Sequence, residues 1–324
     1  MEDVVMRYLE DAIAAEKSFE TQLNGFADEA RDEGARSVFA LHARETREQY
    51  ELLTSRLKAL GSSPSVLKSA FAHFFNAAPK VAQAGHSDEE RTVQDLMMAF
   101  AVENAEVAMY ECLVIAAEAA GDQETIALAK QIQSQERATA EKIWQLIAPA
   151  ARNAWAQAQP SSERENRLVD WIEDVEASER NFESALSSFR GRTTDQPELH
   201  SMFSMMSNKA RTQHERLEKR LRELGGSPST GKSTLAHVLA FSPLTAQAGH
   251  SSDEKSTQDL MITYAAAAAE MAMYESLATT ADEAGDRTTA ALARELQSEE
   301  KEDHTLAWEH LAPCARHAMM TLAH

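Results

Sequence analysis

Apolar residues recur at alternating spacings of three and four along nearly the whole chain, which is the periodicity of amphipathic helices. Glycine, proline and short polar runs separate the periodic stretches. The eight predicted helices cover residues 2–32, 35–60, 89–120, 122–147, 161–190, 196–224, 253–284 and 286–311. Shorter apolar stretches near 65–77 and 232–241 predict one additional crossing helix between the second and third helix of each set of four. The pattern therefore predicts an all-α protein.

The order of these helices repeats within the chain. "YLEDAIAAEKSFETQL" in the first half is matched by "WIEDVEASERNFESAL" in the second, and "AQAGHS" precedes "QDLM" in both. A repeat of this length indicates a duplicated domain rather than a short solenoid unit. We therefore predict two domains, residues 1–158 and 161–324, joined near "AQPSSEREN". Four long helices with one extended connection are typical of a ferritin-like four-helix bundle, so each half is predicted to be one.

Carboxylates interrupt the apolar seams of the first half. Glu16 lies on the predicted inward face of the first helix, Glu45 on the second, Glu103 and Glu106 on the third, and Glu136 on the fourth. A buried, unpaired carboxylate costs several kcal/mol, so a converging set needs shared protons or bound cations. A pair of divalent metal ions bridged by carboxylates meets that need. Oxygen-rich ligand sets favour iron or manganese over zinc or copper.

A metal-free interpretation stays open. The predicted seam of the second helix runs through Val38, His42, Glu45, Gln49 and Leu52. Gln49 on this seam, and a threonine on the fourth, could form a polar network with the glutamates. His42 is either a ligand or an ordinary packed histidine, and the sequence does not decide between the two.

The second half provides an internal control, because its equivalent positions differ. Three glutamates are kept: Glu179, Glu270 and Glu300. At the other positions the second half has replacements, with Lys209 for Glu45, Ala267 for Glu103 and Met206 for His42. A lysine near the remaining glutamates can supply the charge of a lost metal ion by pairing with one of them. We therefore predict that the second site is degenerate, with one question left open: whether Glu300 forms a new site with Asp303 and His304.

Four phrases in the first half, "AEKSFETQL", "HARETREQ", "VENAEVAMY" and "QERAT", resemble in this order the YciE/YciF-type ferritin-like stress proteins. The resemblance extends over both halves. It implies small ferritin-like bundles that dimerise, so the two halves are expected to pack as an intramolecular pseudo-dimer, and the chain to be a monomer or a small oligomer.

The broader ferritin-like and rubrerythrin pattern supplies Glu, Glu-x-x-His, Glu-x-x-Glu and Glu-x-x-His from its four helices. Carried over by resemblance, it implicates the same five residues: Glu16, Glu45, Glu103, Glu106 and Glu136. Two departures are clear, because Glu48 and Thr139 stand where that pattern has histidine. The scarcity of nitrogen ligands argues against the usual oxygen-activating di-iron chemistry.

Charge and composition narrow the classes of partner. A formal net charge of −20 argues against nucleic acid and anionic membrane surfaces as partners. No stretch approaches the roughly 18 apolar residues of a membrane span.

Cys112 and Cys314 occupy non-equivalent repeat positions, so no disulfide framework is expected and a cytoplasmic location is predicted. "GSPSTGKS" at 226–233 matches a phosphate-loop pattern, but it follows a predicted helix instead of a strand, so nucleotide binding is not expected.

The sequence thus predicts a ferritin-like protein with a di-metal centre of iron or manganese in its first half. If redox active, such a centre would react with dioxygen or peroxide, in oxidative-stress protection or in metal handling. The alternative is a non-catalytic helical scaffold or interaction protein with a buried, metal-free polar network. Whether the protein is an enzyme is left open.

Overall fold

The computed structural model describes residues 1–63, 86–157, 161–228 and 250–322. Within these ranges the chain forms eight helices and no strand, as the periodicity predicts. None of the described helices is both long and apolar enough to cross a bilayer. The predicted crossing helices near 65–77 and 232–241 lie outside the described residues, as does most of the phosphate-loop-like segment.

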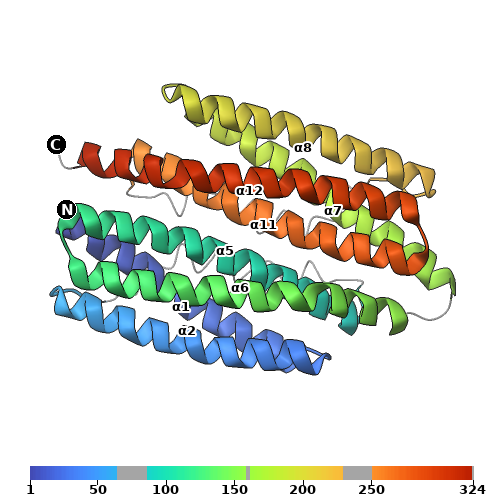
Figure 1. The fold of residues 1–324 in the computed structure, drawn as a ribbon, viewed down its shortest axis with the longest axis horizontal. Coiled ribbons are helices and arrows are strands. Elements are labelled where there is room, and N and C mark those ends of the chain that lie inside the picture. The colour runs from blue at the N-terminus through green and yellow to red at the C-terminus, as the bar shows by residue number, and fades with distance from the viewer. Residues whose placement is uncertain (64–85, 158–160, 229–249, 323–324) are drawn as a thin grey trace.

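Two sets of four helices form two bundles, which lie side by side in Figure 1. The first set is α1 (Glu2–Glu29), α2 (Glu33–Ala59), α5 (Asp88–Ala120) and α6 (Gln123–Gln157). The second set is α7 (Ser161–Arg192), α8 (Pro197–Glu223), α11 (Ser252–Ala284) and α12 (Arg287–Leu322). In each bundle the first helix packs on the second and third, and the fourth packs on the third and second. Two helical hairpins therefore face one another around each core.

Local capping signals begin and end the third helix of each bundle. Ser87 and Glu90 form a reciprocal capping box at the start of α5, and Ser251 and Glu254 form the same box at the start of α11. Both helices end at a glycine in the left-handed region, with φ of 74° at Gly121 and 75° at Gly285. These signals appear in the sequence at equivalent positions of the repeat, so they fix both copies in the same register.

The fourth helix of each bundle is longer than the sequence predicts. Helix α6 continues past residue 147 to Gln157, and α12 continues past 311 to Leu322. Each passes through an internal proline, which removes one backbone hydrogen bond. Apolar residues beyond the prolines are buried, and this packing outweighs the lost bond; they are Ala150, Ala151, Ala154, Ala315, Ala318 and Met319.

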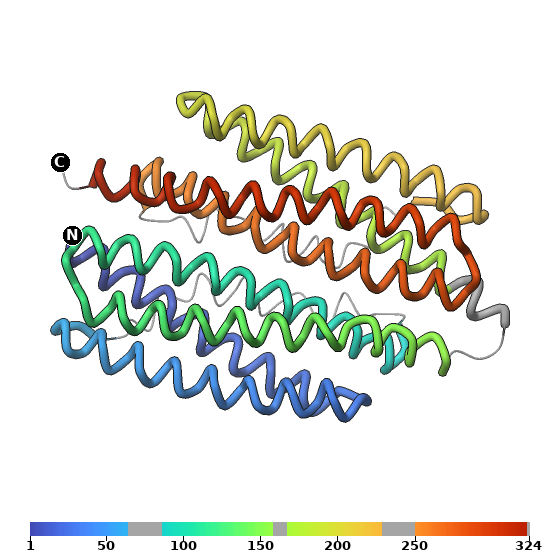
Figure 2. Tube along the Cα trace, viewed as in Figure 1, coloured from blue at the N-terminus to red at the C-terminus, as the bar shows by residue number. Residues whose placement is uncertain are grey.

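The two bundles contact one another mainly through α5, α6, α11 and α12 (Figure 2). Equivalent residues make reciprocal contacts across this interface. His86 Nε2 lies 3.2 Å from Asp174 Oδ2, and His250 Nε2 lies 3.8 Å from Asp11 Oδ2. The two histidines are equivalent in the repeat, as are the two aspartates. Such mutual exchange of contacts is the signature of a twofold interface, here formed within one chain.

Candidate metal centre

Four of the five predicted glutamates are fully buried in the first bundle. Glu16 projects from α1, Glu103 and Glu106 from α5, and Glu136 from α6, each with at most 2% of its surface exposed. The inward faces predicted for Glu16 on α1 and for Glu103 and Glu106 on α5 are correct. On α1 the apolar pattern defines which side of the helix faces inward, whereas α5 is buried on nearly all of its sides.

The predicted seam of α2 is correct at His42 and Gln49 and is displaced by one residue at its other three positions. Leu52 is 44% exposed, whereas Leu53 is completely buried. The core-facing residues of α2 are Ala35, Phe39, His42, Ala43, Thr46, Gln49, Leu53 and Leu57. Glu45 consequently lies at the rim of the bundle, with 32% of its side chain exposed. The helix carries three polar residues on its inner face, which obscures the apolar pattern that would otherwise reveal the phase.

His42, Glu103, Glu106 and Glu136 converge from three helices. Each offers a ligand atom, and these atoms all lie within 4.8 Å of one another. His42 Nε2 approaches Glu103 Oε1 to 2.5 Å and Glu136 Oε2 to 3.9 Å. Glu103 and Glu106 are three residues apart, so they share one face of α5. We call these four residues the first cluster.

The other two predicted residues lie beside the first cluster. Glu16 accepts a hydrogen bond from the Tyr110 hydroxyl. Glu45 Oε2 lies 3.5 Å from His42 Nδ1, on the side of the ring away from Glu103. Gln49 Nε2 donates a hydrogen bond of 2.6 Å to Glu136 Oε1. The sequence left the role of His42 undecided, and the structure places this residue in the first cluster. Glu45 lies outside the cluster.

Most carboxylate oxygens in the first cluster lack a hydrogen-bond donor among the described residues. These are both oxygens of Glu103, both of Glu106 and Oε2 of Glu136; Glu16 Oε2 next to the cluster is also unpaired. The close approach of His42 to Glu103 is not aligned as a hydrogen bond. Native proteins rarely leave buried polar atoms unpaired, so these oxygens call for a cation bound among the four groups or for protons shared between them. The donor set thus fits a metal ion.

Burial changes the proton affinity of these groups. It raises the pKa of Glu16 to about 8, although the Tyr110 hydrogen bond and the charge of His42 oppose the rise. Burial, followed by the charges of neighbouring carboxylates, also raises the pKa of Glu106 and Glu136. For His42 burial favours the neutral ring, but the Glu103 carboxylate outweighs it and raises the pKa to about 9. Without a cation, the cluster therefore retains protons that a metal ion would displace.

The second bundle contains a smaller cluster of Glu179, Glu270 and Glu300, which we call the second cluster. Their ligand atoms also lie within 4.8 Å of one another. Gln213 Nε2 donates a hydrogen bond of 2.8 Å to Glu300 Oε1, and the Tyr274 hydroxyl donates to Glu179. The supporting tyrosine and glutamine are thus the same as in the first bundle, but the ligand atoms of His42 and Glu103 have no counterpart.

Lys209 does not pair with the glutamates of the second cluster, so that prediction is wrong. Its Nζ lies 2.6 Å from Asp303 Oδ1, and 22% of its side chain is exposed. Lys209 is equivalent to Glu45 and lies at the same rim position, too far from the seam to point at the core. Asp303 takes the place of Thr139 and is 2% exposed, so the lysine neutralises a buried charge there.

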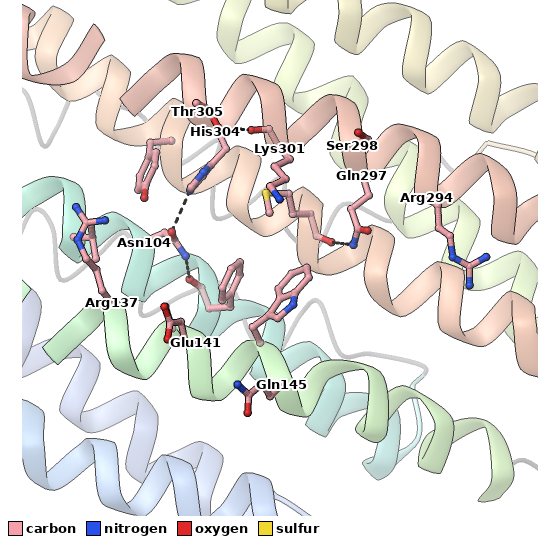
Figure 3. A pocket seen from close by; sticks show the side chains of 16 residues that line it. Asn104, Arg137, Glu141, Gln145, Arg294, Gln297, Ser298, Lys301, His304 and Thr305 are labelled. Atoms are coloured by element: carbon pink, nitrogen blue, oxygen red, sulfur yellow. Dashed lines mark hydrogen bonds between the residues drawn. The ribbon is translucent and has the colours of Figure 1, made fainter. Parts of the chain in front are cut away.

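His304 does not join Glu300 and Asp303 in a rebuilt site. Its Nε2 lies 3.1 Å from Asn104 Oδ1 of the other bundle, and Figure 3 shows it pointing across the interface. Burial lowers the pKa of His304 to about 4, with the charge of Arg137 adding to the effect. The ring is therefore neutral at physiological pH and takes part in contacts between the halves.

Sequence analysis missed the tyrosines that support both clusters. Tyr110 and Tyr274 lie on apolar seams, where a tyrosine is most simply core packing. The signal that could have revealed them is their persistence: each copy keeps a tyrosine on the third helix together with a glutamate on the first, Glu16 or Glu179. The cysteines fit the prediction, since Cys112 and Cys314 are both free thiols.

Comparison with known proteins places the chain in a family. The model of a family described as "Domain of unknown function (DUF892)" matches residues 1–156 and again residues 163–316. No curated protein and no solved structure gives a match. The two matched segments each contain one of the four-helix bundles and together account for nearly all of the chain. The chain therefore belongs to the DUF892 family, a ferritin-like family, and carries two tandem copies of its domain.

Proposed function

We propose that the first bundle holds a carboxylate di-metal centre of iron or manganese, and that the chain serves metal handling or oxidative-stress protection, as the likeness to YciE/YciF-type proteins implies. We also propose residues 1–158 and 161–324 as the two domain units. The observation that carries the proposal is the convergence of buried, unpaired carboxylate oxygens around His42. Three buried carboxylates that converge on one imidazole favour a bound cation.

The ligand assignment follows from the spacing of the atoms. Protein ligands bind such metals at roughly 2.0–2.2 Å, so atoms on opposite sides of one ion are about 4 Å apart. The first cluster has this spread, which supports an ion held by His42, Glu103, Glu106 and Glu136. A second ion would draw on Glu16 and Glu45, with shared carboxylates from the cluster. Three carboxylates and one imidazole suit iron or manganese.

The surrounding residues would orient these ligands and exclude water. Tyr110 fixes one oxygen of Glu16, and Gln49 fixes one oxygen of Glu136. The Phe19 ring packs edge-on against His42, with 5.5 Å between the ring centroids. Outer contacts of this kind set the orientation and basicity of metal ligands. When bound, the metal ions would supply Lewis acidity and, if redox active, electrons for dioxygen or peroxide.

The second cluster is proposed to hold protons in place of metal. Ala267 and Met206 remove two ligands, and Lys209 is committed to Asp303. Burial raises the pKa of Glu300 to about 8, and it also raises the pKa of Glu179 and Glu270. Protonated carboxyl groups can share hydrogen bonds at little electrostatic cost, so this cluster needs no cation.

A non-catalytic scaffold is the second candidate, and two contacts favour it. The approach of His42 to Glu103 and the hydrogen bond from Gln49 to Glu136 neutralise part of the first cluster without metal. In that case the remaining glutamates would share protons, as we propose for the second bundle. The two candidates differ in one measurable property, the metal content of the purified protein.

The experiment compares metal content after matched substitutions in the two bundles. The double variant His42→Met with Glu103→Ala copies the residues of the second bundle, so both side chains are already compatible with this fold. We expect it to remove the metal found in wild-type protein from iron- and manganese-supplemented cells. Glu45→Lys is expected to lower the content, and Glu270→Gln in the second bundle to leave it unchanged. Equal metal content in wild type and the double variant would overturn the proposal.

A further inference from the structure

A cleft lies between the two bundles, apart from both carboxylate clusters. Its volume is about 780 Å³, and α5, α6, α11 and α12 all contribute to its walls (Figure 3). None of the glutamates of the two clusters lines it. Sites for small molecules usually have volumes of about 300–1,000 Å³ and often lie between domains. The cleft therefore has the size and position of a ligand site.

The charge of the cleft is opposite to that of the protein. Arg137, Arg294 and Lys301 line it, against a single carboxylate, Glu141. The whole chain has a formal net charge of −20. Arg294 is paired with Asp282, whereas Lys301 makes no ion pair within the described part of the chain. A local excess of positive charge in an acidic protein favours an anionic ligand.

An aromatic surface lies beside these cations. Trp144 and Phe100 pack together in the cleft wall, with 5.1 Å between the ring centroids. Trp144 is only partly buried. The two rings are tilted by 46° to one another, and the partly buried Trp144 indole offers an apolar face of the kind on which another aromatic ring packs favourably.

The equivalent position in the second bundle is already filled by the protein itself. The guanidinium carbon of Arg137 lies 4.5 Å from the ring centroid of Trp308, the equivalent of Trp144. Tyr264 also packs against Trp308 and stacks on His304. On the cleft side, the equivalent of Arg137 is Lys301, and no cation covers Trp144 among the described residues. One half of the interface is thus closed by its own cation and aromatic rings, and the other is open.

We propose that this cleft binds a small planar aromatic anion, with its ring against Trp144 and Phe100 and its anionic group at Lys301 and Arg294. The contact of Arg137 with Trp308 shows the same pairing of cation and aromatic ring within the protein. Cation and ring contacts of this kind each contribute modestly, so both are needed for a useful affinity. The site does not depend on metal in the first cluster.

Binding of 2-naphthoate to the full chain, measured by isothermal titration calorimetry, tests the proposal. We expect saturable binding at one site per chain. Two matched probes separate the contributions: 2-naphthamide keeps the rings without the charge, and cyclohexanecarboxylate keeps the charge without the rings. Each is expected to bind at least about tenfold more weakly. No saturable binding of 2-naphthoate at millimolar concentration, or equal affinity for the amide, would overturn the proposal.

Substitutions place the probe in the cleft. Trp144→Leu and Lys301→Met are each expected to weaken 2-naphthoate binding about tenfold. Arg294→Met should weaken it about threefold, whereas Lys130→Met should not. Lys130 is the equivalent of Arg294 and loses a matching ion pair, with Glu118, but it lies outside the cleft. Equal effects of Arg294→Met and Lys130→Met on 2-naphthoate binding would contradict the placement of the anion in the cleft. Circular dichroism checks that every variant is folded.

Discussion

The clusters in the two bundles accept hydrogen bonds from equivalent tyrosine and glutamine residues, but they contain different candidate metal ligands. In each, a tyrosine of the third helix donates to a glutamate of the first, and a glutamine of the second helix donates to a glutamate of the fourth. The first cluster adds His42 and Glu103, whereas the second has Met206 and Ala267 at these positions. The same tyrosine and glutamine donors thus hold buried carboxylates in both bundles, although the candidate ligands differ. The fold can therefore accommodate such carboxylates with or without metal.

The rim of each bundle shows the same contrast. Glu45 lies at the rim of the first bundle and contacts His42, a member of the first cluster. Lys209 at the second rim contacts Asp303, a buried carboxylate that replaces Thr139. A carboxylate can attract a cation, whereas a lysine paired with an aspartate has no net charge and supplies no such attraction. The differences therefore concern both the cluster and its edge, and each can be altered separately.

The largest expected effect comes from converting the second cluster into the first. The triple variant Met206→His, Lys209→Glu and Ala267→Glu restores three of the four differing positions and leaves Asp303 in place of Thr139. We expect about twice the metal content of wild type, because the supporting tyrosine and glutamine are already present. The measurement is elemental analysis against protein concentration. If the triple variant is folded and its metal content is unchanged, the ligand set is not what separates the two bundles.

The pH dependence of metal-free stability follows from the raised pKa values. Glu16 and Glu300 have an ordinary pKa of 4.5 and a native pKa of about 8. Between these values the native state holds protons that the unfolded state has released, so stability falls as the pH rises from about 5 to 8. His42 acts in the same direction between its ordinary value of 6.5 and about 9. We expect a loss on the order of a few kcal/mol.

Thermal or urea unfolding of chelator-treated protein from pH 5 to pH 8 measures this loss. Glu16→Gln, which cannot ionise, should flatten the dependence. Metal should oppose it, because ions bind the deprotonated carboxylates. Metal-free protein that becomes more stable toward pH 8 would contradict the burial of protonated glutamates.

A smaller effect is expected from the tyrosines. Tyr110→Phe removes the hydrogen bond to Glu16 and keeps the ring, so we expect metal affinity to fall about 10- to 100-fold. Tyr274→Phe removes the equivalent bond in the second bundle and should leave metal affinity unchanged. Competition with a chromophoric chelator gives both affinities. Similar losses in the two variants would mean that the second bundle also binds metal.

The smallest effect concerns the second rim. Lys209→Met leaves the buried Asp303 carboxylate without its closest cation, and we expect a loss of about 1–2 kcal/mol at neutral pH. The lysine is partly exposed, so water reduces the loss. Lys209→Arg, which keeps the charge, is the control for urea unfolding. A Met variant as stable as wild type would show that Asp303 is protonated or finds another partner.

Much of the fold was predictable because the apolar pattern is strong. The seam through Glu16 is defined by Ala12 and Phe19 on either side, and both the helix and its inner face are correct. Repetition of the pattern in the second half revealed the duplication.

The site was less predictable where polar residues face the core. On α2, His42 and Gln49 are buried, so hydrophobicity alone does not fix the phase, and Glu45 was placed too deep. The partner of Lys209 was wrong for the same reason. Contacts between the halves, such as His86 with Asp174, join residues far apart in the sequence and depend on tertiary packing.

Metal stoichiometry by native mass spectrometry is the most direct test of the difference between the two bundles. Protein purified from iron- and manganese-supplemented cells should carry about two metal ions per chain, and the His42→Met, Glu103→Ala variant should carry none. A metal-free wild-type chain would contradict the account and favour the scaffold. About four ions per chain would contradict it as well, because the second bundle would then bind metal despite Ala267 and Met206.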